Sequence, residues 1–136
     1  MANLLLATDA DWIFDEVDAA LSGAHRVFRV HSGADVLPAV REVEPALVLL
    51  DLQIGNMGGM ATCLNLRLEE RAGRVGVRKI LMLLDREADI FLARRAEADG
   101  WLIKPLDAFR LRRAVQTTFD SGSYTEGLPA SMTAPS

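Results

Sequence analysis

Short apolar runs alternate with stretches of helical periodicity along most of the chain, and this alternation constrains the fold more than any other feature. The apolar runs predict five strands, at about residues 4–7, 26–30, 46–50, 80–84 and 101–103. Apolar residues at helical spacing predict five helices, at about residues 12–21, 35–43, 60–72, 88–98 and 106–119. Asp11 is expected to cap the first helix.

Regular alternation of strand and helix predicts an α/β fold, because a right-handed helical crossover returns each strand parallel to the previous one. We expect an open, doubly wound, five-stranded parallel sheet with the flavodoxin-like strand order 2-1-3-4-5. Three of the strands are apolar throughout, as strands covered on both faces must be. Function in such sheets lies at the carboxyl ends of the strands, so the residues that follow the strands are the candidate site.

The composition predicts one folded domain over residues 1–120 and a flexible tail over residues 121–136. The tail is rich in Ser, Thr, Gly, Ala and Pro, and Leu128 and Met132 are its only large aliphatic residues. We expect it to be dispensable for folding, and we expect no effector domain after it.

Charge and hydropathy restrict the classes of partner. The formal net charge is −4, which does not favour nucleic-acid binding. No apolar run approaches the length of about 18 residues that spans a bilayer, and the basic start of a signal peptide is missing. We therefore expect a cytoplasmic protein without membrane insertion. A homodimer is left open by the sequence.

Two aspartates follow strands that this order places side by side. Asp9 follows the first strand and Asp51 follows the third, so both carboxylates should face the same edge of the sheet. Two close carboxylates repel each other unless a cation or a proton lies between them. Mg²⁺ held by carboxylates and water would resolve this repulsion. Lys104 follows the fifth strand and is within reach of Asp51.

Three segments around these residues resemble the signature segments of response-regulator receiver domains. They are residues 4–9 with Thr8-Asp9, residues 48–59 with Asp51, and residues 100–105 with Trp101 and Lys104-Pro105. The similarity extends over roughly residues 3–119. It implies a receiver domain of a two-component signalling system, a signalling phosphoprotein rather than an enzyme.

The resemblance also implies a mechanism. A histidine kinase, a phosphotransfer protein or a small phosphodonor would transfer a phosphoryl group to the carboxylate of Asp51. Lys104 would pair with the phosphoryl oxygens, and the peptide bond before Pro105 would be cis. Mg²⁺ would be held by Asp9, Asp51 and the backbone carbonyl of Gln53.

The site departs from the family pattern at several positions. Thr8 replaces one acidic residue, so it would act on the metal only weakly and through water. Leu84 replaces the hydroxyl residue that normally binds the phosphoryl group, and Asp85 replaces a small residue with a charge that would oppose phosphate. With Trp101, these are the switch positions, and we expect weak coupling between Asp51 and the Trp101 surface.

Three functions compete on this sequence. The first is a single-domain response regulator, phosphorylated on Asp51, that signals through contacts with an unknown downstream protein. The second is a pseudo-receiver that binds proteins without phosphorylation. The third, least favoured, is a phosphatase similar to haloacid dehalogenases, in which Asp9 is the nucleophile and Asp11 the general acid/base. Short length and a missing later acidic pair argue against it.

Overall fold

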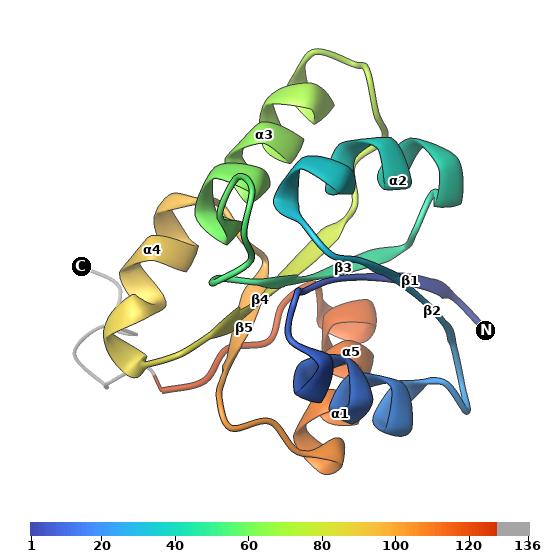
Figure 1. Ribbon diagram of the computed structural model, residues 1–136, viewed down its shortest axis with the longest axis vertical. Coiled ribbons are helices and arrows are strands. Elements are labelled where there is room, and N and C mark those ends of the chain that lie inside the picture. Colours follow the sequence, from blue (N-terminus) through green and yellow to red (C-terminus); the bar gives the residue numbers. More distant parts are fainter. Residues whose placement is uncertain (128–136) are drawn as a thin grey trace.

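The computed structural model describes residues 1–127, which form a five-stranded parallel sheet between two layers of helices (Figure 1). The strand order is β2-β1-β3-β4-β5, which confirms the doubly wound, flavodoxin-like fold. All four neighbouring pairs are parallel. The strands are β1 (Asn3–Ala7), β2 (Arg26–Val30), β3 (Leu47–Asp51), β4 (Lys79–Leu84) and β5 (Gly100–Ile103).

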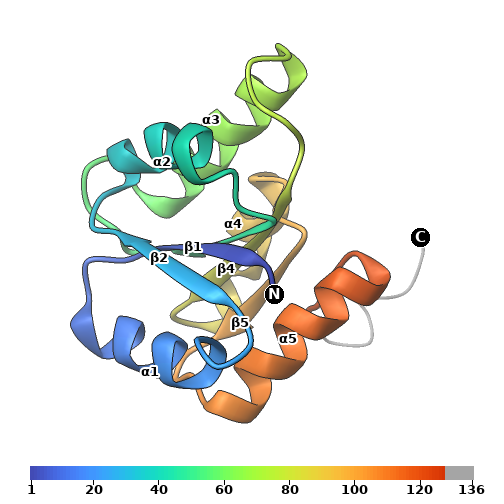
Figure 2. The same cartoon turned by 90° about the vertical axis from the view of Figure 1, so that its right-hand side faces the viewer.

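The helices divide between the two faces of the sheet, as the view in Figure 2 shows. Helices α1 and α5 cover one face, and α2, α3 and α4 cover the other. Their bounds are α1 (Asp11–Leu21), α2 (Val36–Val43), α3 (Gly59–Arg71), α4 (Ile90–Arg95) and α5 (Ala108–Ser121). Short 3₁₀ turns, η1 (Gly33–Asp35) and η2 (Glu87–Asp89), precede α2 and α4. Within residues 1–127, no helix has the length and apolar character needed to cross a bilayer.

The central strands are apolar throughout because alternate side chains enter two different cores. In β1, Leu4 and Leu6 pack with α1 and α5, whereas Leu5 and Ala7 pack with the helices of the other face. All four side chains are fully buried. Helices therefore pack on both faces of the sheet, and this packing fixes the positions of the residues at its carboxyl edge.

Several predicted element ends need correction. The fourth helix is shorter than predicted: after Arg95 the chain turns through Glu97, which has a φ of 65°. Helix α5 begins at Ala108 rather than residue 106, because Asp107 caps it by accepting a hydrogen bond from the Arg110 amide. Asp11 does not cap α1: it is the first helical residue and pairs with Arg29 at 3.0 Å.

A buried arginine ties three parts of the α3 side together. Arg67 donates hydrogen bonds to the backbone carbonyls of Glu97 and Arg78 and to the carboxylates of Glu70 and Asp99. Arg67 is only 8% exposed, so its charge must be paired, and the two carboxylates supply the negative charge while also accepting from its N–H groups. Asp99 also accepts the Ile80 amide at 2.8 Å, which fixes the start of β4.

The segment after α5 differs from the predicted tail. Tyr124 forms a parallel bridge with Gly100 of β5, and Glu126 contacts β5 through both its backbone and its side chain. For residues 121–127 the expected flexible tail is therefore corrected, since the folded unit continues to Gly127. Leu128 and Met132 lie outside the described residues.

Candidate functional site

Asp51 lies at the carboxyl end of β3, between β1 and β4. The register pairs Ala7 with Leu50 and Asp51 with Leu83, so the end of β3 is flanked by neighbours on both sides. Asp51 is only 2% exposed. A carboxylate so deeply buried needs hydrogen-bond donors, and the strand ends supply them.

Three donors surround the Asp51 carboxylate. Its Oδ1 accepts hydrogen bonds from Lys104 Nζ at 2.7 Å and from the Gln53 amide at 3.1 Å. Its Oδ2 accepts one hydrogen bond, from the hydroxyl of Thr8 at 2.8 Å. A carboxylate oxygen offers about two lone pairs, so Oδ2 keeps a free one while Oδ1 is saturated.

Thr8 acts on Asp51 directly, which the sequence did not predict. Its side chain is fully buried, and its oxygen also accepts the Ala10 amide at 3.1 Å. That second bond orients the hydroxyl hydrogen toward Asp51. In the sequence, the only indication of a role for Thr8 was that it replaces an acidic residue of the family pattern. That replacement did not distinguish a role at the metal from this hydrogen bond to Asp51.

Lys104 is shared between two carboxylates. Its ammonium lies 2.7 Å from Asp51 and 2.8 Å from Asp85. Burial lowers the pKa of Lys104, but the hydrogen bonds to both carboxylates outweigh burial and raise it overall. Burial likewise raises the pKa of Asp85, and the hydrogen bonds from Lys104 and Gln53 reverse this and lower it. The peptide bond between Lys104 and Pro105 is cis.

Asp9 reaches the same edge from the end of β1, but it is exposed and contacts the loop after β3. Its Oδ2 accepts the Gly55 amide at 3.2 Å. That loop is fixed from the other side by Gly33, whose amide donates to the Gly55 carbonyl at 2.9 Å. A Cβ at Gly33 would lie 1.8 Å from the Met57 carbonyl oxygen, so this close approach requires glycine.

The oxygen donors at this edge suit Mg²⁺ in a limited way. The carboxylates of Asp9 and Asp51 and the carbonyl of Gln53 are hard ligands, and Mg²⁺ commonly takes one or two carboxylates with several waters. Among residues 1–127, no three acidic, His or Cys side chains cluster as a metal site. The donor set therefore fits an ion that keeps much of its water.

The remaining predicted positions lie around this centre without joining it. Leu84 is fully buried at the end of β4 and offers no hydrogen bond from its side chain. Trp101 is 4% exposed and donates from Nε1 to the Glu126 carbonyl at 2.9 Å. The structure thus brings together Asp51, Lys104, Thr8 and Gln53, adds Asp85, and leaves Trp101 in a separate contact with the C-terminal segment.

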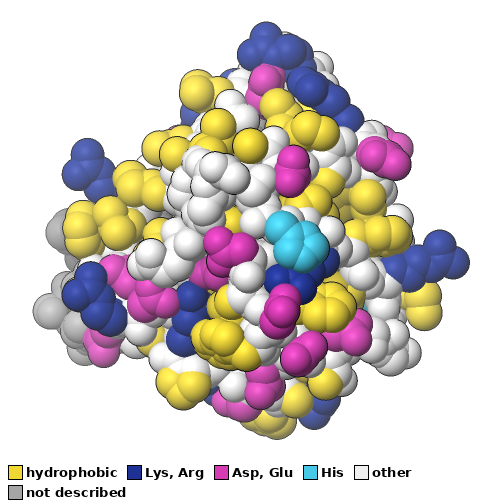
Figure 3. Space-filling model, in the orientation of Figure 1, with side chains coloured by type: hydrophobic (Ala, Val, Ile, Leu, Met, Phe, Trp, Pro, Cys, Tyr) yellow, Lys and Arg dark blue, Asp and Glu magenta, His cyan; other side chains and the backbone are white. Residues whose placement is uncertain are grey.

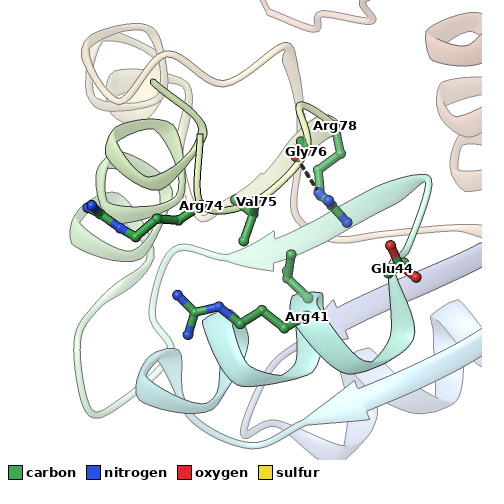
Figure 4. A pocket seen from close by; sticks show the side chains of 7 residues that line it. Arg41, Glu44, Arg74, Val75, Gly76 and Arg78 are labelled. Atoms are coloured by element: carbon green, nitrogen blue, oxygen red, sulfur yellow. Dashed lines mark hydrogen bonds between the residues drawn. The ribbon is translucent and has the colours of Figure 1, made fainter. Parts of the chain in front are cut away.

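Away from this centre, the surface has a polar hollow. It has a volume of about 200 Å³ and lies between the C-terminal half of α2 and the loop that leads into β4 (Figure 4). Arg41 and Arg78 line it, but Arg78 already donates to the carbonyls of Pro45 and Gly76.

On the face in Figure 3, acidic and basic side chains are interspersed, so that face presents a field of mixed sign.

Comparison with known proteins gives a consistent result. A family model described as the response regulator receiver domain matches residues 4–116. The transcriptional regulatory protein AfsQ1 of Streptomyces coelicolor is 31% identical over 135 residues, covering 91% of this chain and 57% of AfsQ1. The nitrate/nitrite response regulator NarL of Escherichia coli is 28% identical over 117 residues, covering 84% of this chain and 53% of NarL. The chain thus spans about half the length of these relatives.

Solved structures agree on the fold. A putative response regulator from Chloroflexus aurantiacus has a TM-score of 0.77 at 25% identity, covering 88% of this chain and 98% of that one. The chemotaxis response regulator CheY4 of Vibrio cholerae has a TM-score of 0.75 at 23% identity, covering 85% and 97%.

Proposed function

The chain belongs to the response-regulator receiver-domain family, whose members are two-component signalling modules, and we propose that Asp51 is its phosphoryl acceptor. The carrying observation is the ion pair of 2.7 Å between Lys104 Nζ and the buried carboxylate of Asp51. A lysine in this position can neutralise a charge that arrives on Asp51. The family match gives the phosphatase hypothesis no support.

The proposed reaction is a phosphoryl transfer to a carboxylate oxygen. Oδ2 of Asp51 attacks phosphorus, the new O–P bond forms an acyl phosphate, and the bond from phosphorus to the leaving group breaks. In a histidine kinase or phosphotransfer protein, the leaving group is an imidazole nitrogen. We assign the attack to Oδ2 because Oδ1 already accepts two hydrogen bonds.

The residues around Asp51 have separate tasks in this proposal. Thr8 orients Oδ2 by donating to it at 2.8 Å. Lys104 pairs with Oδ1 before the transfer and with the phosphoryl oxygens after it. Asp9, Asp51 and the Gln53 carbonyl would hold Mg²⁺, with Asp51 contributing Oδ1 once Lys104 has moved from that oxygen to the phosphoryl oxygens. When bound, the ion supplies positive charge that offsets the phosphoryl oxygens. Thr8 could contact that ion only through water.

The phosphorylated domain would signal by contact with a separate downstream protein. Leu84 limits that signal, because it is fully buried and cannot donate a hydrogen bond to a phosphoryl oxygen.

A phosphorylation assay tests the proposal. The full chain is incubated with Mg²⁺ and a small phosphodonor, and intact mass is measured beside Asp51→Asn. We expect a mass gain of one phosphoryl group that requires Asp51 and is lost with chelator. The chain without mass gain, or with an equal gain in Asp51→Asn, would overturn Asp51 as acceptor.

A further inference from the structure

The C-terminal strap, residues 123–127, extends the sheet beyond β5. The Trp101 amide donates to the Tyr124 carbonyl at 2.9 Å, and the Ile103 amide donates to the Glu126 carboxylate at 2.9 Å. Tyr124 and Glu126 are partly buried while Thr125 is exposed, which is the alternation of an extended strand. In Figure 1 this segment is the red trace that follows α5. The strap therefore satisfies backbone donors that an open sheet edge would leave unpaired.

The residue at the start of β5, Gly100, also allows an extended segment to approach the strand closely. A Cβ at Gly100 would lie 1.9 Å from the Tyr124 carbonyl oxygen, so only glycine allows the strap to approach this closely. The indole of Trp101 is capped by the Glu126 backbone, to which its Nε1 donates at 2.9 Å. Both features recognise the backbone of the bound segment.

One side chain of the strap is recognised by its charge. Glu126 accepts hydrogen bonds from Arg110 Nε at 2.9 Å, from a second Arg110 nitrogen, and from the Tyr124 hydroxyl at 2.7 Å. Arg110 also donates to the carbonyls of Ile103 and Pro105. The guanidinium is thereby held over the end of β5, where it meets an acidic side chain.

We propose that the β5 edge, with Trp101 and Arg110, is a recognition site for an extended segment carrying an acidic residue, and that the strap is its resident occupant. A partner protein that offers such a segment must displace the strap, which makes the strap an autoinhibitory contact. Main-chain pairing along an edge strand and one charged anchor are a common way to bind an extended peptide. The inference concerns a partner surface and does not depend on phosphorylation of Asp51.

The first experiment weakens the contact between the strap and the β5 edge, using the full chain without phosphodonor. Trp12→Phe removes the exposed indole of α1, so that Trp101 is the only reporter. In that background, Glu126→Ala is compared with Thr125→Ala, whose side chain is exposed. We expect Glu126→Ala to increase acrylamide quenching of Trp101 and to speed hydrogen exchange at the Trp101 and Ile103 amides by about tenfold or more. Thr125→Ala should change neither.

The second step asks whether the vacated edge recognises a segment in trans. The probe is a synthetic peptide of residues 121–127, added to each chain, with a peptide carrying the Glu126→Ala change as its control. We expect the Glu126→Ala chain to bind the first peptide and to regain protection of Trp101. The unaltered chain should not bind it, because its own strap competes at an effective concentration in about the millimolar range.

Gly100→Ala gives an independent check, since the added methyl group excludes strap and peptide alike. Trp101 should become accessible in this variant, and the peptide should fail to restore its protection. The proposal is overturned if Trp101 stays protected in both Glu126→Ala and Gly100→Ala. It is also overturned if the Glu126→Ala chain exposes Trp101 but binds both peptides equally or neither of them.

Discussion

Asp85 competes with Asp51 for Lys104, because the ammonium lies 2.8 Å from one carboxylate and 2.7 Å from the other. Before any phosphoryl group arrives, the single cation is therefore divided between two anions. Asp85 is also the more exposed partner, at 32% of its side chain, so its pairing is weakened by solvent. This arrangement sets the first prediction.

Replacing Asp85 should release Lys104 for the proposed phosphoryl group. We expect Asp85→Ala to raise the initial rate of Mg²⁺-dependent phosphoryl incorporation by about twofold to fivefold, which corresponds to the modest worth of a partly exposed ion pair. Time-resolved intact mass measures the rate. Asp85→Glu retains the charge and is the control. A slower Asp85→Ala chain would mean that Asp85 positions Lys104 productively.

The hydroxyl of Thr8 should stabilise the fold through Asp51. Thr8→Val keeps the shape but leaves a buried carboxylate oxygen without its donor, so we expect a loss of about 1–3 kcal/mol in the free energy of unfolding. Urea denaturation measures it. Thr118→Val is the matched control, because that buried hydroxyl donates only to the Ala114 carbonyl of its own helix. Equal losses in the two variants would contradict a specific role for Thr8.

Coupling between Asp51 and Trp101 should be weak in the native sequence. A ligand shifts a conformational population only by its differential affinity, and Leu84 offers the phosphoryl group no donor. In the Trp12→Phe background, Mg²⁺ with a phosphoryl mimic should leave Trp101 fluorescence nearly unchanged. Leu84→Thr combined with Asp85→Ala should restore a response. A large change in the unaltered site, abolished by Asp51→Asn, would reveal another route.

Acid should loosen the C-terminal strap. Burial raises the pKa of Glu126, but hydrogen bonds from Arg110 and Tyr124 outweigh burial and lower it overall. A depressed folded pKa means that Glu126 stabilises the strap above its unfolded pKa of about 4.3, and that this stabilisation is lost as pH falls through the folded value. Neither Arg110 nor Tyr124 titrates in that range, since the Tyr124 pKa is raised to about 12. Trp101 quenching should rise on acidification, and Glu126→Gln should flatten the profile.

Truncation tests the corrected end of the folded unit. Composition alone predicts that a chain ending at Gly122 keeps its melting temperature. The contacts of Tyr124 and Glu126 with β5 predict instead a decrease of about 5 °C or more, the shift that a loss of one or two kcal/mol causes at this size. Thermal unfolding followed by circular dichroism decides between them, with a chain ending at Gly127 as the control. An unchanged value after Gly122 would mean that the strap adds no stability.

The sheet could be predicted well from the sequence because burial of apolar strands on both faces leaves a local pattern in the chain. Leu47 and Leu49 enter one core while Val48 and Leu50 enter the other, and a short apolar run is the direct result. Strand order then followed from topology. The placement of Asp51 at the end of β3 followed from both.

The pairing of side chains was less predictable. Asp85 was expected to repel phosphate, and its pairing with Lys104 depends on the register of β4 with β5, which no local pattern encodes. The strap was missed because Tyr124 is its only residue that packs against a hydrophobic core, and its other contacts are backbone hydrogen bonds and the ion pair between Glu126 and Arg110. Amino-acid composition predicts the burial of apolar residues far better than it predicts backbone hydrogen bonds or a single ion pair.

The guanidinium of Arg67 has a consequence for how this molecule comes apart. It joins α3 to the carbonyls of Arg78 and Glu97 and to Asp99, which precede β4, follow α4 and precede β5 respectively. None of these segments can leave without stranding a buried cation, and that cost is large. Helix α3 and the segment from β4 through α4 to β5 should therefore unfold together as a single cooperative unit. A protease should cleave sites in these elements together or not at all.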